Sequence, residues 1–417
     1  MILAGAIALD QGRLATPVQQ FPPSQRKPNP MFSRTHSLWL VGFRPFFALA
    51  CLAGLSLPIA WILIFKGVLP APSQNFTPVQ WHAHEMFFGF GWAVLGGFLL
   101  TATKNWVGIR GYHGATLMFL AAAWVFERIG MSFGGAWPLP LFLLANNLFL
   151  FAIVTLLLAT LIGYRDKDNH RRDNILFLFV LPLFWVAKTL LLSPDHFNVG
   201  WSMTLGLFRV AFLIMLERTL SQFMLSAFQV EILRRPVLDA TIKALAVVLV
   251  FATLLPPELA VDLELILGAL LLGRLAFWYP HKAFRRLDIG IMYLGYLAIA
   301  TQLLLDALPP PGDTGWVGTV SVHVFTFGAM GLIIPAMMIR IANGHTGRKV
   351  IFGRLEKTVL WIMVAAFFLR LIGPQFAPGA YLRWLDLAAT CWFAAFGLLA
   401  WRHIPQLARP RIDGRVH

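Results

Sequence analysis

The most regular feature of this sequence is an alternation of long apolar segments with short loops that carry charge. An apolar run of about 20 residues matches the hydrocarbon thickness of a bilayer. Because a backbone in lipid must satisfy its own hydrogen bonds, each such run predicts a helix. The pattern therefore predicts an all-α, polytopic membrane helix bundle of about twelve transmembrane helices, at 40–65, 82–103, 114–131, 138–163, 174–193, 200–228, 237–255, 258–279, 288–307, 316–341, 357–374 and 381–401.

Lysine and arginine are concentrated in every second loop of this pattern, and the intervening loops hold only Lys66, Arg128 and Arg383. Basic loops stay on the cytoplasmic side of a membrane. We therefore predict that both termini lie on the cytoplasmic side. The predicted organisation is a disordered cytoplasmic tail over 1–36, a twelve-helix domain over 37–404 and a basic cytoplasmic tail over 405–417.

Composition agrees with lipid as the solvent, since 58% of residues are hydrophobic and only 13% are charged. The net charge of +15 is spread over short loops, so it does not predict a nucleic-acid surface. Cys51 and Cys391 both lie in apolar segments, which argues against a disulfide framework or a thiolate metal site. No CxxCH motif is present for covalent haem attachment.

The second predicted span begins with ionisable residues, in the sequence WHAHEMFFGFGW from residue 81. Such groups in a membrane segment are costly and usually functional. At about 100° per residue, His82 and His84 point to nearly opposite faces. Either the first turn is unwound or the two rings serve different groups. Glu85 is a candidate proton donor and Met86 a candidate thioether ligand, and the alternative for the whole group is solvation at the membrane surface.

The same helix carries a lane of small residues that includes Gly89 and Gly96. Small residues let a neighbouring helix approach closely, and they would equally leave a flat slot for a porphyrin ring. Both interpretations stay open at this stage.

The tenth predicted span carries His323, Met330 and Met337 at intervals of seven, which is two helical turns. If the helix begins near Trp316, His323 lies at about the depth of His82, and the two histidines are predicted to form one metal or haem site near the outer face. Imidazole binds haem iron and copper, and thioether sulfur suits Cu(I). The alternatives are ordinary packing for the methionines and an interhelical hydrogen bond for His323.

Two further groups are less specific. His345 and Arg348 lie at the other end of the tenth span, about 30 Å from His82 across the core. They would bind a propionate, an anion or a separate ligand, or else form a basic helix end at the inner leaflet. Arg209 and Glu217 in the sixth span predict either a proton or anion path or buried structural pairs.

These residues also resemble a known family. The likeness to the NnrS family rests on Gly42-Phe-Arg-Pro-Phe-Phe47, Trp81-His-Ala-His-Glu-Met86, Gly97-Phe-Leu-Leu-Thr-Ala102, Asn105-Trp106, His323 with Gly328 and Gly331, and Gly344-His-Thr-Gly-Arg348. The resemblance implies an inner-membrane protein that contains haem and copper and is linked to nitric oxide metabolism and nitrosative stress. The matching residues that could bind metal are His82, His84, His323 and His345.

The resulting hypothesis is a protein with haem b and copper that acts on nitric oxide as an oxidoreductase or scavenger, with an electron-donor partner if it turns over. In this hypothesis Glu85, Arg209 and Glu217 are catalytic candidates. His82, His323, Gly89, Gly96, Met330, His345 and Arg348 are candidates for cofactor binding, and His82, His84, His323, His345 and Met86 for metal binding. The alternatives are a secondary transporter of copper or a small anion, and an accessory protein that responds to nitric oxide or haem without turnover.

Overall fold

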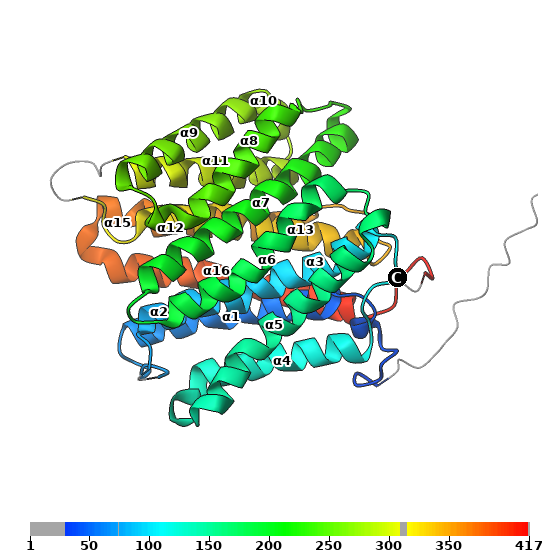
Figure 1. Cartoon of the computed structure of the whole chain (residues 1–417), viewed down its shortest axis with the longest axis horizontal. Coiled ribbons are helices and arrows are strands. Elements are labelled where there is room, and N and C mark those ends of the chain that lie inside the picture. Colours follow the sequence, from blue (N-terminus) through cyan, green and yellow to red (C-terminus); the bar gives the residue numbers. More distant parts are fainter. Residues whose placement is uncertain (1–29, 74, 309–314, 416–417) are drawn as a thin grey trace, which may run out of the picture.

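The chain folds into long helices that run side by side along one axis (Figure 1). The computed structural model describes residues 30–73, 75–308 and 315–415, and this part contains no strand. The α-helices are α1 (Phe43–Phe65), α2 (Pro78–His84), α3 (Trp92–Trp106), α4 (Ala115–Phe133), α5 (Leu139–Gly163), α6 (Arg171–Leu192), α7 (Phe197–Phe228), α8 (Pro236–Val248), α9 (Pro257–Ala276), α10 (Pro280–Ala283), α11 (Leu287–Ala307), α12 (Val320–His323), α13 (Gly331–Gly344), α14 (Arg354–Leu371), α15 (Gly373–Phe376) and α16 (Tyr381–Ala408). The predicted all-α bundle is confirmed.

Eleven helical segments within the described residues are long and apolar enough to cross a membrane. The one predicted span that is not among the eleven is the eighth, at 258–279, which is α9; its 20 residues include Asp262, Glu264 and Arg274. It nevertheless runs along the bundle beside α8 and α11 (Figure 1). Both ends of the described chain lie at the same end of the bundle, where Arg44 Nη1 donates to the carbonyl oxygen of Arg409 at 2.7 Å. The chain therefore passes along the bundle an even number of times.

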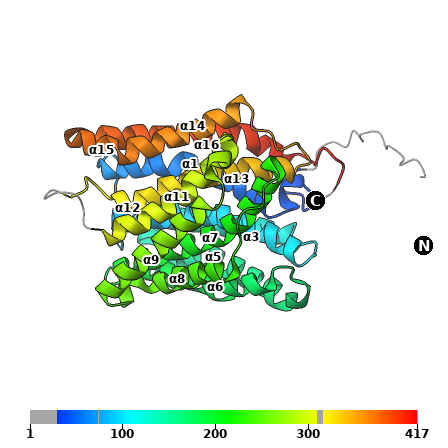
Figure 2. The ribbon, with the colours of Figure 1, turned by 90° about the horizontal axis from the view of Figure 1, so that it is seen from above.

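The bundle has an inner group of helices and an outer group. α14 and α16 form one side and α6 and α8 the other, with α11, α13 and α7 between them (Figure 2). The segments Pro78–Trp106, Phe197–Phe228, Leu287–Ala307 and Val320–Gly344 are mostly buried, whereas α1, α5, α6 and α14 are buried over a smaller share of their apolar stretch, 39% in each. The two histidine-bearing helices are therefore central.

Both central histidine helices change to π-helix directly after a histidine. The π-helical segment η2 (Glu85–Gly91) joins α2 to α3, and η6 (Val324–Met330) joins α12 to α13. A π turn bonds i to i+5 and is common at functional sites. It also rotates the following residues around the helix axis, so a seven-residue spacing no longer keeps side chains on one face.

The helix starts differ from the predicted ones. α2 begins at Pro78, because Thr77 caps it and Gln80 completes a capping box. α12 begins at Val320 instead of 316, after Gly318 at φ +77°. His82 and His323 thus lie in the first two turns of their helices, at the end of the bundle that holds α2, α12 and α15 (Figure 1). We call it the histidine end.

The described parts of the predicted tails, residues 30–36 and 405–415, lie at the opposite end. Residues 1–29 lie outside the described part, and residues 30–36 form turns in which the indole N–H of Trp39 donates to the Met31 carbonyl at 2.6 Å. α16 continues to Ala408, beyond the predicted limit at 404.

Candidate functional site

A cavity of about 620 Å³ opens at the histidine end of the bundle, and both His82 and His323 line it. This volume is within the range of small-molecule and cofactor sites. Its walls come from α1, α2, α7, α11, α12, α14 and α16, and they are rich in aromatic side chains, namely Trp61, Phe65, Phe87, Phe197, Trp201, Trp316, Phe327, Tyr381 and Trp392. Two histidines that are 241 residues apart in the sequence are thus brought to one site.

The ring of His323 is held by its own helix start. Nδ1 lies 2.7 Å from the Thr319 carbonyl oxygen and 2.9 Å from Thr319 Oγ1. A proton on Nδ1 donates to that carbonyl and leaves the lone pair on Nε2, which is the arrangement of a metal-ligating histidine. The guanidinium of Arg370 lies against the same ring, with Nη2 3.3 Å from both ring nitrogens.

The ring of His82 stacks on Trp61, with 4.2 Å between the ring centroids and 15° between the planes. No hydrogen bond or ion pair to His82 is present within the described residues, and its side chain is half-buried on the cavity wall. Met86, one turn later, lines the same cavity. The fixed ring and free nitrogens of His82 suit a ligand that the cavity admits.

A carboxylate also reaches this cavity. Asp306 of α11 accepts hydrogen bonds from Gln302 and Ser321, and all three residues line the cavity wall. Arg209 of α7 is buried and interacts electrostatically with Asp306 and Glu264. Arg209 is therefore near the cavity through Asp306 and is not paired with Glu217.

His84 points away from the cavity into a closed polar group, which we call the His84 cluster: His84, Glu85, Glu127, Arg128, Asn146 and Lys188. His84 Nδ1 lies 3.1 Å from Glu85 Oε1, and His84 Nε2 lies 3.2 Å from Asn146 Nδ2. Both ring nitrogens thus have partners inside the protein. Of the two alternatives that the sequence left open, an unwound first turn is not observed, since α2 is helical from Pro78 to His84, and the two rings face different surroundings.

Charges in the His84 cluster are balanced. Arg128 lies 3.1 Å from a Glu85 oxygen and 3.2 Å from a Glu127 oxygen, and Lys188 pairs with Glu127. Glu85, Glu127 and Lys188 are almost completely buried. Glu85, the predicted proton donor, does not line the cavity.

The glycine lane of this helix is filled by protein. A Cβ on Gly89 would lie 2.1 Å from Arg128 Nη1, and a Cβ on Gly96 would lie 2.6 Å from Ile153 Cδ1. Neither glycine lines the cavity. Met330 is buried against Gly91 because the π turn of η6 rotates it away from the face of His323. Close packing accounts for these three residues in the structure.

His345 and Arg348 lie at the opposite end of the bundle. From His323 to His345 the helix rises about 30 Å, at 1.5 Å per residue, so these two residues do not share the cavity. The ring of His345 packs on Phe43 at 5.4 Å between centroids.

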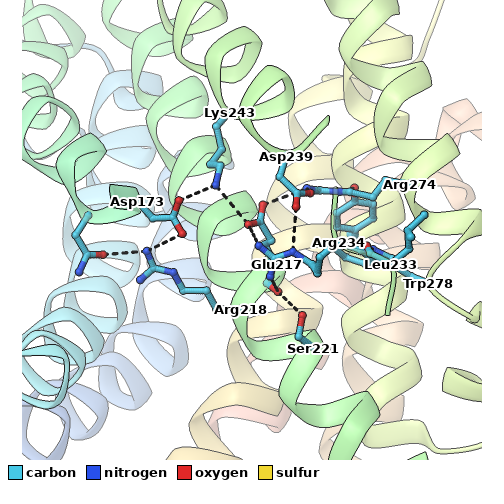
Figure 3. A network of polar contacts seen from close by, with 12 residues as sticks. Asp173, Glu217, Arg218, Ser221, Leu233, Arg234, Asp239, Lys243, Arg274 and Trp278 are labelled. Atoms are coloured by element: carbon cyan, nitrogen blue, oxygen red, sulfur yellow. Dashed lines mark hydrogen bonds and ion pairs between the residues drawn. The ribbon is translucent and has the colours of Figure 1, made fainter. Parts of the chain in front are cut away.

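Glu217 belongs to a separate set of ion pairs that joins α6, α7, α8 and α9 (Figure 3). Arg274 Nη1 lies 3.2 Å from Glu217 Oε2 and 3.1 Å from Asp239 Oδ1. Arg234 also pairs with Glu217 and Asp239. Since each of these charges has a partner, they act as buried structural pairs in this structure and do not form an open path.

Sequence reasoning missed three cavity residues, Trp61, Asp306 and Arg370. Asp306 and Arg370 are charged residues inside predicted spans. Arg209 and Glu217 became candidates for that same reason, so Asp306 and Arg370 could have been predicted as well. Trp61 could not have been predicted, because the sequence holds fifteen tryptophans and nothing in it distinguishes this one.

The donor set is suited to haem more than to a protein-only metal site. No group of three or more His, Cys, Asp or Glu side chains in the described part of the chain could hold a metal ion. Haem needs only one or two protein ligands, because the porphyrin supplies the other four.

The comparison with protein families gives one result. The family model described as "NnrS protein" matches residues 37–411, which is nearly the whole chain. No curated protein matches the chain. Because this match covers nearly the whole chain, the chain is a member of the NnrS family, membrane proteins linked to the nitric oxide response.

Proposed function

We propose that this protein binds a b-type haem in the cavity at the histidine end and acts on nitric oxide there, as an oxidoreductase or a scavenger. The observation that carries the proposal is that His82 and His323 line one cavity. The hydrogen bond from His323 Nδ1 to the Thr319 carbonyl supports a ligating role for Nε2.

Other cavity residues fit the remaining needs of a haem. Arg370 supplies a cation for a propionate, beside the ring of His323. Phe327 and Trp392, in edge-to-face contact with 4.9 Å between their centroids, supply an apolar wall for the macrocycle and keep water out. Asp306 is a group at the cavity wall that can hold a proton. Once bound, haem supplies a redox-active iron with an open or exchangeable position for a diatomic ligand.

Copper belongs to the proposal as a second metal with a smaller donor set. His82 and Met86 line the same cavity, and an imidazole with a thioether is the pair that suits Cu(I). If His323 is the haem ligand, this pair is free for copper, with a third ligand from outside the protein.

The proposed location is the inner membrane with both termini in the cytoplasm. The end that holds Arg44, Arg348 and Arg411 is rich in cations, and the positive-inside rule assigns such an end to the cytoplasm. The cavity would then face the outer side, where nitric oxide, which is small and apolar, arrives through lipid or from solution. Repeated reduction of nitric oxide would require an electron-donor partner.

The test is an optical spectrum of detergent-purified protein, produced with haem supplementation, in oxidised and dithionite-reduced forms, with and without nitric oxide, with iron and copper measured on the same sample. We expect a Soret band that shifts with nitric oxide and about one iron per chain. A colourless protein without iron would refute the haem proposal. A Soret band that nitric oxide leaves unchanged would refute the action on nitric oxide while keeping the haem.

A further inference from the structure

Four separate pieces of the chain meet at the end of the bundle opposite the cavity. They are the start of α1, the end of α3, the turn after α13 and the segment that follows α16. Arg44 Nη1 donates to the carbonyl oxygens of Leu407 and Arg409, both at 2.7 Å. Arg411 Nη1 donates to the His345 carbonyl at 3.0 Å. The C-terminal segment is thus fixed against His345.

This junction brings cations together. His345 interacts electrostatically with Lys104, Arg411 and Arg44. Burial, with a smaller contribution from these three cations, lowers the pKa of His345 to about 4. The imidazole is therefore neutral near pH 7, and the positive charge of the junction comes from the lysine and the arginines.

The junction has fewer anionic partners than cations. Asp413 accepts from Arg411 Nε at 2.9 Å and accounts for that side chain. Lys104 is 8% exposed, and its side chain has no hydrogen bond or ion pair within the described residues. Arg44 is 1% exposed, and its Nε has no partner there either; its Nη1 bonds only to neutral carbonyls. Buried cations without a counter-charge are costly.

We infer that Lys104 and Arg44 form a binding site for an anionic phosphate group beside His345, where Arg411 adds positive charge nearby. A phosphate offers several acceptor oxygens, so it can accept from the Lys104 ammonium and a guanidinium at once. The neutral His345 ring adds one N–H donor. The site lies about 30 Å from the cavity along α13, so it is independent of the proposed haem site.

Two sources supply this chemistry. One is the headgroup of an anionic phospholipid, because basic pockets between transmembrane helices at a membrane surface bind such headgroups. The other is free phosphate in solution. Lys104 lies at the end of a spanning helix, where both a lipid headgroup and free phosphate could reach it. The experiment must therefore distinguish these two ligands.

The test uses the full chain in detergent. Thermal unfolding is measured with added phosphatidylglycerol, with added phosphatidylcholine and with inorganic phosphate, each at constant ionic strength, and bound lipid is identified by native mass spectrometry. We compare wild type with Lys104→Gln, and with Lys357→Gln as a matched control, because Lys357 is an exposed lysine at the start of α14 near the same end. Lys104→Arg keeps the charge.

We expect phosphatidylglycerol to raise Tm in the wild type and in the Lys357→Gln and Lys104→Arg variants. Lys104→Gln should weaken binding about tenfold or more, since a charge-assisted hydrogen bond is lost. An equal effect of inorganic phosphate would identify a free anion as the ligand, and retention of phosphatidylglycerol alone would identify the lipid. An undiminished response in Lys104→Gln, or no response of the wild type to either phosphate source, would overturn the inference. If Lys104→Gln does not fold, Arg411→Gln takes its place.

Discussion

Two histidines of the same helix turn, His82 and His84, lie in opposite kinds of surroundings. His82 lines a cavity, stacks on Trp61 and has no hydrogen bond in the described structure. His84, two residues later, is fully buried with both ring nitrogens occupied by Glu85 and Asn146. Sequence position alone does not distinguish them. The difference lies in the neighbours, because the cavity leaves the nitrogens of His82 free while the His84 cluster uses those of His84.

This comparison separates two roles for polar groups inside a membrane protein. A group whose charges are paired inside the protein holds helices together, and here α2, α4, α5 and α6 meet at the His84 cluster. A group whose bonds are unsatisfied and which faces a cavity is available for a ligand. Changes on the His84 face should therefore alter stability, and changes on the His82 face should alter binding.

The largest effect is expected from Lys188→Met. Removing one partner of a buried ion pair leaves Glu127 without its lysine, and such a loss costs about 3–5 kcal/mol of the free energy of unfolding. Thermal or denaturant unfolding in detergent measures it. The matched control is Lys66→Met, whose exposed pair with Asp386 at 2.6 Å should contribute about 0–1 kcal/mol. Equal effects of the two substitutions would show that the His84 cluster is not a structural element.

The next effect is on haem retention. His323→Ala should lower haem affinity by more than the roughly 10- to 100-fold that loss of an outer-shell partner causes, while the fold is kept. Haem per chain, from the Soret band and iron analysis, is the measurement. In His84→Gln, which changes the opposite face, the folded protein should retain haem even if less of the protein folds. Loss of haem in His84→Gln but not in His323→Ala would reverse the assignment of the two faces.

The bundle was predictable from the sequence because apolar length reports directly on a membrane span, and the pairing of His82 with His323 followed from their similar depth. The rest depended on contacts that a sequence does not display. The π turns rotated Met330 off the face of His323, and the space beside Gly89 proved to hold the guanidinium of Arg128. Asp306 lies inside a predicted span and could have been selected as a charged residue, but its hydrogen bond with Ser321 of another helix could not be read from the sequence.

A smaller effect tests the glycine lane directly. Gly89→Ala would place a Cβ 2.1 Å from Arg128 Nη1 and disturb its pairs with Glu85 and Glu127, so we expect a loss of about 1–3 kcal/mol. A Cβ on Gly96 would crowd Cδ1, the end of the Ile153 side chain, while its other neighbours lie at 3.6 Å or more, so Gly96→Ala should be nearly neutral. Haem content should be unchanged in both. If Gly89→Ala lost haem without losing stability, the lane would be the porphyrin slot that the sequence suggested.

The smallest effect is expected from Arg370→Gln, which probes the cavity face without removing a ligand. The guanidinium lies 3.3 Å from the ring nitrogens of His323, and a nearby positive charge favours the reduced, less positive haem. Its removal should lower the reduction potential by an amount on the order of tens of millivolts, the size of a screened charge interaction of about 1 kcal/mol. Spectroelectrochemistry of the loaded protein measures this shift. Arg348→Gln, at the far end of α13, removes a charge of the same type and should leave the potential unchanged. If both substitutions shifted the reduction potential equally, the potential would depend only on the net charge of the protein. The proposed position of Arg370 beside the haem would then be wrong.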